Sequence, residues 1–124
     1  MSAGSTPIPV ILDTDIGTDI DDTWALAFML RCPELDVRLI VAGTRNTTYR
    51  AKIIARLLEA AGRTDIPVGV GIHFASSMEP YLAGVDNQVE WVHDYRLEDY
   101  PGTVHYDGVQ AIIDTIMTSD HPVT

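Results

Sequence analysis

The sequence is nearly free of cysteine and has no long apolar stretch. Cys32 is the single cysteine in 124 residues, so the chain can form neither an intramolecular disulfide nor a metal cluster held by several thiolates. No apolar run approaches the ~20 residues that cross a bilayer. The N-terminal segment, Met1 to Pro9, has neither the basic nor the apolar part of a signal peptide. These absences lead us to expect a soluble, cytoplasmic protein.

Basic residues are also scarce. Lys and Arg number 8 against 18 Asp and Glu, which gives a formal net charge of -10. Nucleic acids and anionic membranes both bind clustered positive charge, so we expect neither as a partner. The hydrophobic share of 46% and charged share of 21% are typical of a folded protein, and the length suits one domain.

The acidic residues are concentrated in two regions. In residues 86–120, eight acidic side chains accompany the single basic residue Arg96, and solvated helix surfaces and loops explain that distribution. The other region is denser, with five of the thirteen aspartates lying within ten residues: Asp13, Asp15, Asp19, Asp21 and Asp22. A solvated surface does not explain this second cluster.

Short apolar runs alternate with segments of helical period. The predicted strands are Ile8–Leu12, Leu35–Ala42 and Ile66–Gly71; the predicted helices run from Asp21 or Asp22 to Cys32, and from Thr47 or Thr48 to Ala61. Residues 72–103 are rich in loops, with a short helix near 88–95, and a clearer helix covers 108–117. This alternation predicts an α/β fold, an open and mostly parallel sheet with flanking helices and right-handed crossovers.

The helical period also predicts which side chains face the core. Trp24 and Phe28 are four residues apart and are expected in the core. In the second long helix, the apolar side chains are expected to face the sheet and the charged ones to face solvent. The charged set is Arg50, Lys52, Arg56 and Glu59.

Polar or glycine-rich segments follow each predicted strand, at residues 13–22, 43–48 and 71–74. In a parallel sheet these segments share one rim, where ligands bind. Carboxylates crowded on one short loop repel one another, and burial would protonate some of them unless a cation is present. Hard oxygen ligands suit Ca²⁺ or Mg²⁺, and Gly17 allows the loop to turn tightly. The cluster therefore favours a metal site, although helix capping by Asp21 and Asp22 is an alternative use for two of the carboxylates.

Two other acidic motifs fit the loop less well. An EF-hand counted from Asp13 requires glycine at position 6 and glutamate at position 12, where this chain has Thr18 and Trp24. A haloacid-dehalogenase-type phosphatase would use Asp13 as the nucleophile and Asp15 as the acid. That family expects threonine or valine where this chain has Gly17, and it leaves the later aspartate pair without a role.

The spacing Asp13-Thr14-Asp15-x-Gly17, followed by Asp21-Asp22-x-x-Ala25-Leu26, is a specific motif. Further segments accompany it: Val41-Ala42-Gly43, Arg50-Ala51, and residues 57–63, 66–71 and 107–114. In all of them the chain resembles the inosine-uridine-type nucleoside hydrolases. The resemblance implies that residues 1–124 are the N-terminal portion of a single nucleoside hydrolase domain. It also implies hydrolysis of ribonucleosides to free base and ribose, a role in purine and pyrimidine salvage, and a homo-oligomeric parent.

The resemblance also implies roles for individual residues. By analogy with the family, Asp15 and Asp22 hold one Ca²⁺, and Asp15 is the general base that activates a water molecule. Asp13 and Asp21 support the site and contact water or ribose. Asn46 matches a polar residue that contacts the sugar, although an asparagine in a turn before a threonine cap explains it equally well.

The chain departs from the family pattern in two respects. Asp19-Ile20 and Thr44-Arg45 look like insertions, and the first leaves open whether Asp19 or Asp21 is the supporting residue. Family members are also considerably longer, and their later part supplies further metal ligands, so this chain looks like an incomplete piece that we expect to be inactive alone. The rival interpretation is a non-catalytic metal-binding or interaction fragment.

Overall fold

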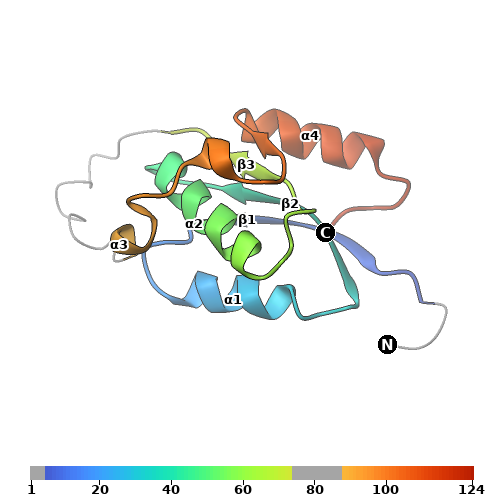
Figure 1. Ribbon diagram of the computed structural model, residues 1–124. Helices are drawn as coiled ribbons and strands as arrows, with labels where there is room; N and C mark the ends of the chain where they lie inside the picture. The colour runs from blue at the N-terminus through green and yellow to red at the C-terminus, as the bar shows by residue number, and fades with distance from the viewer. Residues whose placement is uncertain (1–4, 74–87) are drawn as a thin grey trace.

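The protein is described by a computed structural model, which covers residues 5–73 and 88–124. Four parallel strands form one sheet in the order β1-β2-β3-β4 (Figure 1). The strands are β1 (Ile8–Thr14), β2 (Leu35–Ala42), β3 (Val68–Val70) and β4 (Val104–His105). The helices are α1 (Asp21–Met29), α2 (Thr47–Ala60), α3 (Val89–Val92) and α4 (Gly108–Thr118), with a 3₁₀ turn, η2, at Leu97–Asp99. The predicted α/β fold with a parallel sheet and flanking helices is confirmed.

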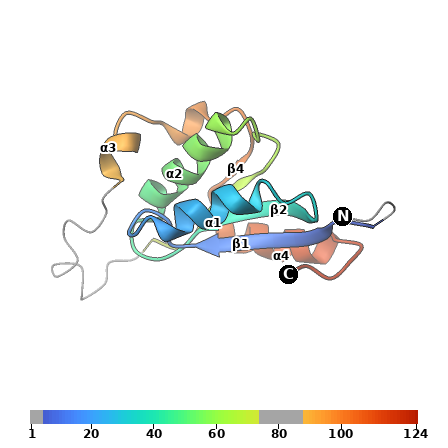
Figure 2. The same ribbon diagram turned by 90° about the horizontal axis from the view of Figure 1, so that it is seen from below.

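Two layers of helices enclose the sheet. Helices α1 and α2 lie on one face, and α4 lies on the other (Figure 2). The larger core is on the α2 side, where Ile53, Ile54 and Leu58 are fully buried against Ile40 and Val68. Each such side chain stabilises the fold by roughly 1.5–3 kcal/mol relative to an exposed position. The smaller core, on the α4 side, joins Leu39 and Val41 to Ala111.

Strand β2 alternates between these two cores, which explains why its sequence is almost continuously apolar. Leu39 and Val41 point toward α4, whereas Ile40 and Ala42 belong to the core beneath α2. A strand buried on both faces has no solvent-facing side, so period-two alternation of polar residues is lost. The predicted bounds of this strand are those observed.

Element boundaries differ from the sequence-based expectations at several places. Strand β3 covers only Val68–Val70 of the predicted Ile66–Gly71, and α3 is shorter than the predicted 88–95. Strand β1 continues to Thr14, because its pairing with β2 extends to Thr14 opposite Ala42. Helix α1 ends at Met29, and tighter turns follow it, with the Cys32 amide donating to the Met29 carbonyl. Strand β4 lies within the stretch predicted to be loop, and its partner is β3, with Val68 opposite Val104.

The core position predicted for Trp24 and Phe28 is wrong. Their side chains are 70% and 73% exposed, and Leu26 is the fully buried residue of α1. Residues two apart on a helix lie on opposite sides, so burying Leu26 against the sheet turns both aromatic rings to solvent. In the described ranges, 5–73 and 88–124, no helix is long and apolar enough to span a membrane.

Candidate metal and nucleoside site at the end of strand β1

Strand β1 has a backbone neighbour along each of its edges. Strand β2 pairs with one edge, and Thr124, which follows α4, lies along the other. The Thr124 amide donates to the Pro9 carbonyl at 2.9 Å, and the Thr124 carbonyl accepts from the Ile11 amide at 2.8 Å. Because the sheet is parallel, the carboxyl end of β1 lies at the rim where open α/β sheets bind ligands.

An acidic pocket lies at this position. Its volume is about 350 Å³, and its lining comes from the end of β1 and the loop after it, the first turn of α1, and the loop after β2: Asp13, Thr14, Asp15, Asp22, Gly43 and Thr44. The loop after β1 is anchored beneath the pocket by Ile16, whose side chain is completely buried in the main core. Of the five clustered aspartates, the fold thus brings Asp13, Asp15 and Asp22 to one pocket.

Asp15 and Asp22 are in direct contact in this pocket. The pKa of Asp15 is raised above its ordinary value, first because its carboxyl group hydrogen-bonds that of Asp22, then because of partial burial and the negative charge of Asp22. The positive charge of Arg50 opposes this increase. Two carboxyl groups held this close favour either a shared proton or a bound cation.

Thr14 holds Asp22 in place, a role that we did not predict. Its hydroxyl group donates to Asp22 Oδ2 at 2.5 Å and accepts from the Ile16 amide at 3.1 Å. The side chain is buried, on the last residue of β1. Thr14 therefore ties the first turn of α1 to the end of the strand. The position of Thr14 between Asp13 and Asp15 in the motif is the sequence feature from which this role could have been predicted.

Asp13 approaches the backbone of the second rim loop at Gly43. A Cβ atom built on Gly43 would lie 2.8 Å from Asp13 Oδ1, closer than such atoms pack. The absence of a side chain at Gly43 thus leaves the space in which the Asp13 carboxylate lies. The glycine that ends β2 therefore shapes the site as well as ending the strand.

We expect Gly43→Ala to weaken cation binding several-fold while leaving the melting temperature within a few degrees of wild type. The added methyl group displaces one carboxylate of the pocket, and alanine adopts the backbone conformation of this residue. Calorimetric titration with Ca²⁺ measures the effect. In an Asp13→Ala background the same substitution should have no further effect, because the displaced group is gone. Additive losses in the double variant would contradict this explanation.

Asp21 and Asn46 lie outside the acidic pocket. Asp21 is exposed in the first turn of α1, whose N-cap residue is Ile20 without a side-chain capping bond, so the alternative use of Asp21 and Asp22 as side-chain caps is not observed. The carboxylate of Asp22 bonds Thr14 instead, because the end of β1 lies beside it. Asp19 is exposed and is likewise not among the residues that line this pocket.

Asn46 is the N-cap of α2, a position that we predicted for Thr47 or Thr48. Its Oδ1 accepts from the Tyr49 amide at 3.0 Å, which satisfies one of the unpaired N–H groups at the helix start. The Thr47 hydroxyl donates instead to the Gly71 carbonyl, at the end of β3. Asn46 borders a neighbouring pocket of about 270 Å³ rather than the acidic one.

Tyr49 and Arg50 reach from α2 to the aspartate loop. Arg50 was predicted on the solvent face of the helix, but it is only 2% exposed. Its Nη1 donates to the carbonyls of Asp15 and Ile16, the latter at 2.9 Å. Arg50 is three, four and seven residues before Ile53, Ile54 and Leu57, so the helical period placed it on the buried face. Its charge misled the prediction.

Gly17 turns the loop with a left-handed backbone, at a φ of 114°. The Tyr49 hydroxyl donates to the Gly17 carbonyl at 2.9 Å, and a Cβ on Gly17 would lie 2.8 Å from Ile53 Cδ1. Glycine is therefore required here both by the backbone conformation and by the close approach of α2. This agrees with the tight turn predicted from the sequence.

The oxygen ligands in the pocket are of the type that binds a hard divalent cation, but they fill only part of its coordination shell. Asp15 and Asp22 present adjacent carboxylate oxygens, the ligand type of Ca²⁺ and Mg²⁺. Ca²⁺ takes about 6–8 oxygen ligands, so two carboxylates leave positions for water, substrate or further groups. Across residues 5–73 and 88–124, no group of three or more acidic, histidine or cysteine side chains is arranged to hold a metal ion.

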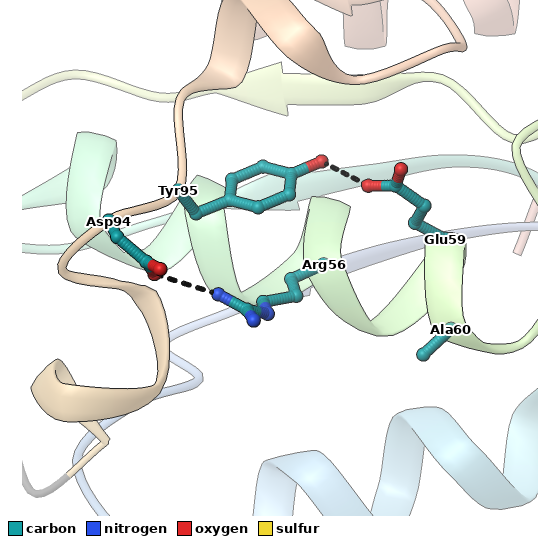
Figure 3. Close-up of a pocket in the computed structure, with 5 residues that line it drawn as sticks. All are labelled: Arg56, Glu59, Ala60, Asp94 and Tyr95. Atoms are coloured by element: carbon teal, nitrogen blue, oxygen red, sulfur yellow. Dashed lines mark hydrogen bonds and ion pairs between the residues drawn. The ribbon is translucent and has the colours of Figure 1, made fainter.

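A second and larger pocket lies on the outer side of α2, with a volume of about 440 Å³ (Figure 3). Its polar groups are already paired. Arg56 Nη1 bonds Asp94 Oδ1 at 3.0 Å, and the Tyr95 hydroxyl donates to Glu59 Oε2 at 2.8 Å. Burial, and then the bond to Glu59, raise the pKa of Tyr95 well above its ordinary value. These contacts fasten the segment after α3 to α2, so we assign this pocket a structural role.

Known proteins share this chain's sequence pattern. A probable uridine nucleosidase 2 of Arabidopsis thaliana is 46% identical over 66 residues, which cover 52% of this chain and 20% of the relative. The pyrimidine-specific ribonucleoside hydrolase RihA of Escherichia coli O1:K1 is 39% identical over 66 residues, which cover 52% of this chain and 21% of the relative. These matches span about a fifth of each relative's length. No solved structure matches the chain.

The family comparison covers much more of the chain than these pairwise matches do. The family model of the inosine-uridine preferring nucleoside hydrolases matches residues 10–124, which include most of β1, the acidic pocket and the described helices. The chain belongs to the inosine-uridine preferring nucleoside hydrolase family.

Proposed function

We propose that the protein carrying this chain hydrolyses the N-glycosidic bond of ribonucleosides to free base and ribose, with Ca²⁺ bound at the acidic pocket. The observation that carries the proposal is the gathering of Asp13, Asp15 and Asp22 in one pocket at the carboxyl end of β1, where Asp15 lies against Asp22. Family membership supports the reaction class. The carboxylate oxygens support a hard cation, and the choice of Ca²⁺ rests on the resemblance.

Each of the three aspartates in the pocket has a proposed role. Asp15 and Asp22 would hold the cation, which when bound orients a water molecule and the ribose hydroxyls and lowers the pKa of that water. Asp15 accepts a proton from the water as general base. Asp13 supports the site beside the sugar. Departure of the base leaves positive charge on the ribose, and the pocket's carboxylates stabilise that charge.

Two further residues are proposed to act from outside the acidic pocket. Asp21 would support the site through the first turn of α1, next to Asp22. Asn46 would contact the sugar through its amide nitrogen, because its Oδ1 is already engaged in capping α2. Replacing Asn46 by serine, which also caps helices, separates a sugar contact from a capping role.

The test is release of free base from inosine and from uridine by the native protein that carries this sequence. Chromatography after incubation with Ca²⁺, and in parallel with a chelator, measures the released base. We expect turnover that the chelator abolishes and added Ca²⁺ restores. Turnover that is indifferent to the chelator would overturn the metal assignment, and absence of turnover would favour the non-catalytic metal-binding interpretation.

For residues 1–124 alone we expect cation binding without measurable turnover. The described residues bring two carboxylates into contact, whereas the reaction needs the cation, the water and the ribose held together.

We also propose that the parent protein is a homo-oligomer. Apolar side chains exposed on α1, at its N-cap and on α4 support this: Ile20, Trp24, Phe28, Ile113 and Met117. Sedimentation velocity measures the oligomeric state.

Asp22→Asn is expected to weaken cation binding before it affects the chemical step. The amide keeps the hydrogen bond from Thr14 but removes one charged ligand, so about 10-fold or more Ca²⁺ should be needed for half-maximal activity. At saturating Ca²⁺ part of the activity should return, because Asp15 is intact. Activity measured over a range of Ca²⁺ concentrations shows this shift. A loss that no concentration of Ca²⁺ reverses would show that Asp22 has more than a ligand's role.

A further inference from the structure

Arg50 is a buried charge that donates three hydrogen bonds to backbone carbonyl groups. The residue is 2% exposed and lies in the first turn of α2. Moving a guanidinium group out of water is strongly unfavourable unless its N–H groups are paired. A side chain kept buried under this condition is held in one position, and so are the groups that it bonds.

The partners of Arg50 belong to the two loops that line the acidic pocket. Nε donates to the Thr44 carbonyl at 2.9 Å, in the loop after β2. Nη1 donates to the carbonyls of Asp15 and Ile16, in the loop after β1. Asp15 and Thr44 both line the pocket. The Arg50 side chain thus bonds both loops that line the pocket.

The second loop has an unusual backbone geometry next to Arg50. Thr44 and Arg45 have φ angles of 65° and 52°, in the left-handed region that non-glycine residues rarely adopt. Such conformations persist where the surrounding contacts hold them. The planar guanidinium group offers several donors in a fixed arrangement, which the single ammonium group of lysine does not.

We propose that Arg50 is a positioning residue of this site: it sets the separation of the Asp15 and Thr44 loops and thereby the affinity of the pocket for a divalent cation, without contacting the cation itself. The part of this inference that concerns cation affinity rests on the proposed function, because it requires the Ca²⁺ site. The other part, the coupling of the two loops by Arg50, does not depend on the metal. Substitution of groups that orient metal ligands typically lowers metal affinity 10–100-fold.

The first measurement is calorimetric titration of Ca²⁺ into wild type, Arg50→Lys and Arg56→Lys. Arg56 is the matched control, because it lies on the same helix, pairs with Asp94 (Figure 3) and does not line the acidic pocket. We expect Arg50→Lys to bind Ca²⁺ at least 10-fold more weakly, and Arg56→Lys to bind within twofold of wild type. Titration well below each melting temperature compares folded protein with folded protein.

The second measurement, amide hydrogen exchange without metal, does not depend on the proposed function. In Arg50→Lys we expect exchange to accelerate at least 10-fold in residues 15–17 and 43–46, with β3 unchanged. A purely structural loss of stability would accelerate exchange throughout the fold. Arg50→Gln provides a second variant if the lysine variant is poorly folded.

The outcomes separate the two proposals. Faster exchange at the rim together with failure of wild type to bind Ca²⁺ would overturn the metal assignment and keep the positioning role. Unchanged exchange at the rim, or Ca²⁺ affinity within twofold of wild type in both Arg50 variants, would overturn the role of Arg50. Weaker Ca²⁺ binding and faster exchange confined to the two loops would support both proposals.

Discussion

Replacing Asp15 by asparagine is expected to reduce nucleoside hydrolysis by the native protein at least about 1000-fold while leaving the fold intact. The amide has nearly the shape of the carboxylate but cannot accept a proton at neutral pH and brings no charge to a cation. Base release from inosine and uridine measures the loss. Asp114→Asn removes the same charge from the surface of α4 and should retain full activity.

The same substitution should stabilise the metal-free chain near neutral pH. Asp15 has a raised pKa because it contacts Asp22, so in the metal-free folded state its ionised form is disfavoured. Asparagine removes that unfavourable charge. A thermal scan in chelator should therefore show Asp15→Asn melting at or above the wild-type temperature. Full activity of the variant, or a large loss of stability, would contradict the role assigned to Asp15.

Ca²⁺ is expected to raise the melting temperature of residues 1–124 substantially. At 100 times its dissociation constant, a ligand that binds only the folded state adds about 2.7 kcal/mol to the free energy of unfolding. For a chain of this size the corresponding shift is roughly 10 °C. Asp15→Asn and Asp22→Asn should each reduce the shift. An unchanged melting temperature at millimolar Ca²⁺ would contradict a cation site in this chain.

The Ca²⁺ effect should depend on pH with a definite sign. The pKa of Asp15 is above its ordinary value of 3.8 in the folded state. Between pH 3.8 and the raised pKa, the folded chain therefore retains a proton that the unfolded chain releases. The contribution of Asp15 to metal-free stability is therefore fully present below pH 3.8 and is lost as pH rises through the raised pKa. Ca²⁺ replaces that proton, so its stabilising effect should be larger at pH 7 than at pH 4. Scans at the two pH values, with and without Ca²⁺, measure this difference.

Much of the fold was predictable because its signals are local. The strands and α2 depend on apolar runs and helical period, and the bounds predicted for β2 are those observed. The order of strands and helices limits the topology to a parallel sheet. That topology in turn places the loops after β1 and β2 at one rim, which is why the pocket was expected where it lies.

Polarity was a poor guide to burial at three residues. Arg50 is buried because carbonyl groups from two loops pair with its N–H groups, and the loop after β1, which carries Ile16, is far from Arg50 in the sequence. Trp24 and Phe28 are exposed because the sheet meets the opposite side of α1, where Leu26 lies. In each case the outcome depends on which elements pack together.

The sequence by itself determined the fold class, the family resemblance and the loop that carries the clustered carboxylates, because apolar period and motif spacing are properties of neighbouring residues. Only the tertiary structure decided which carboxylates meet. The end of β1 lies beside the first turn of α1, so Thr14 can hold Asp22 next to Asp15, whereas Asp21 stays outside the pocket. The close approach of Gly43 to Asp13 likewise arises from the pairing of β1 with β2. Contacts between segments far apart in the chain depend on packing that no single segment encodes.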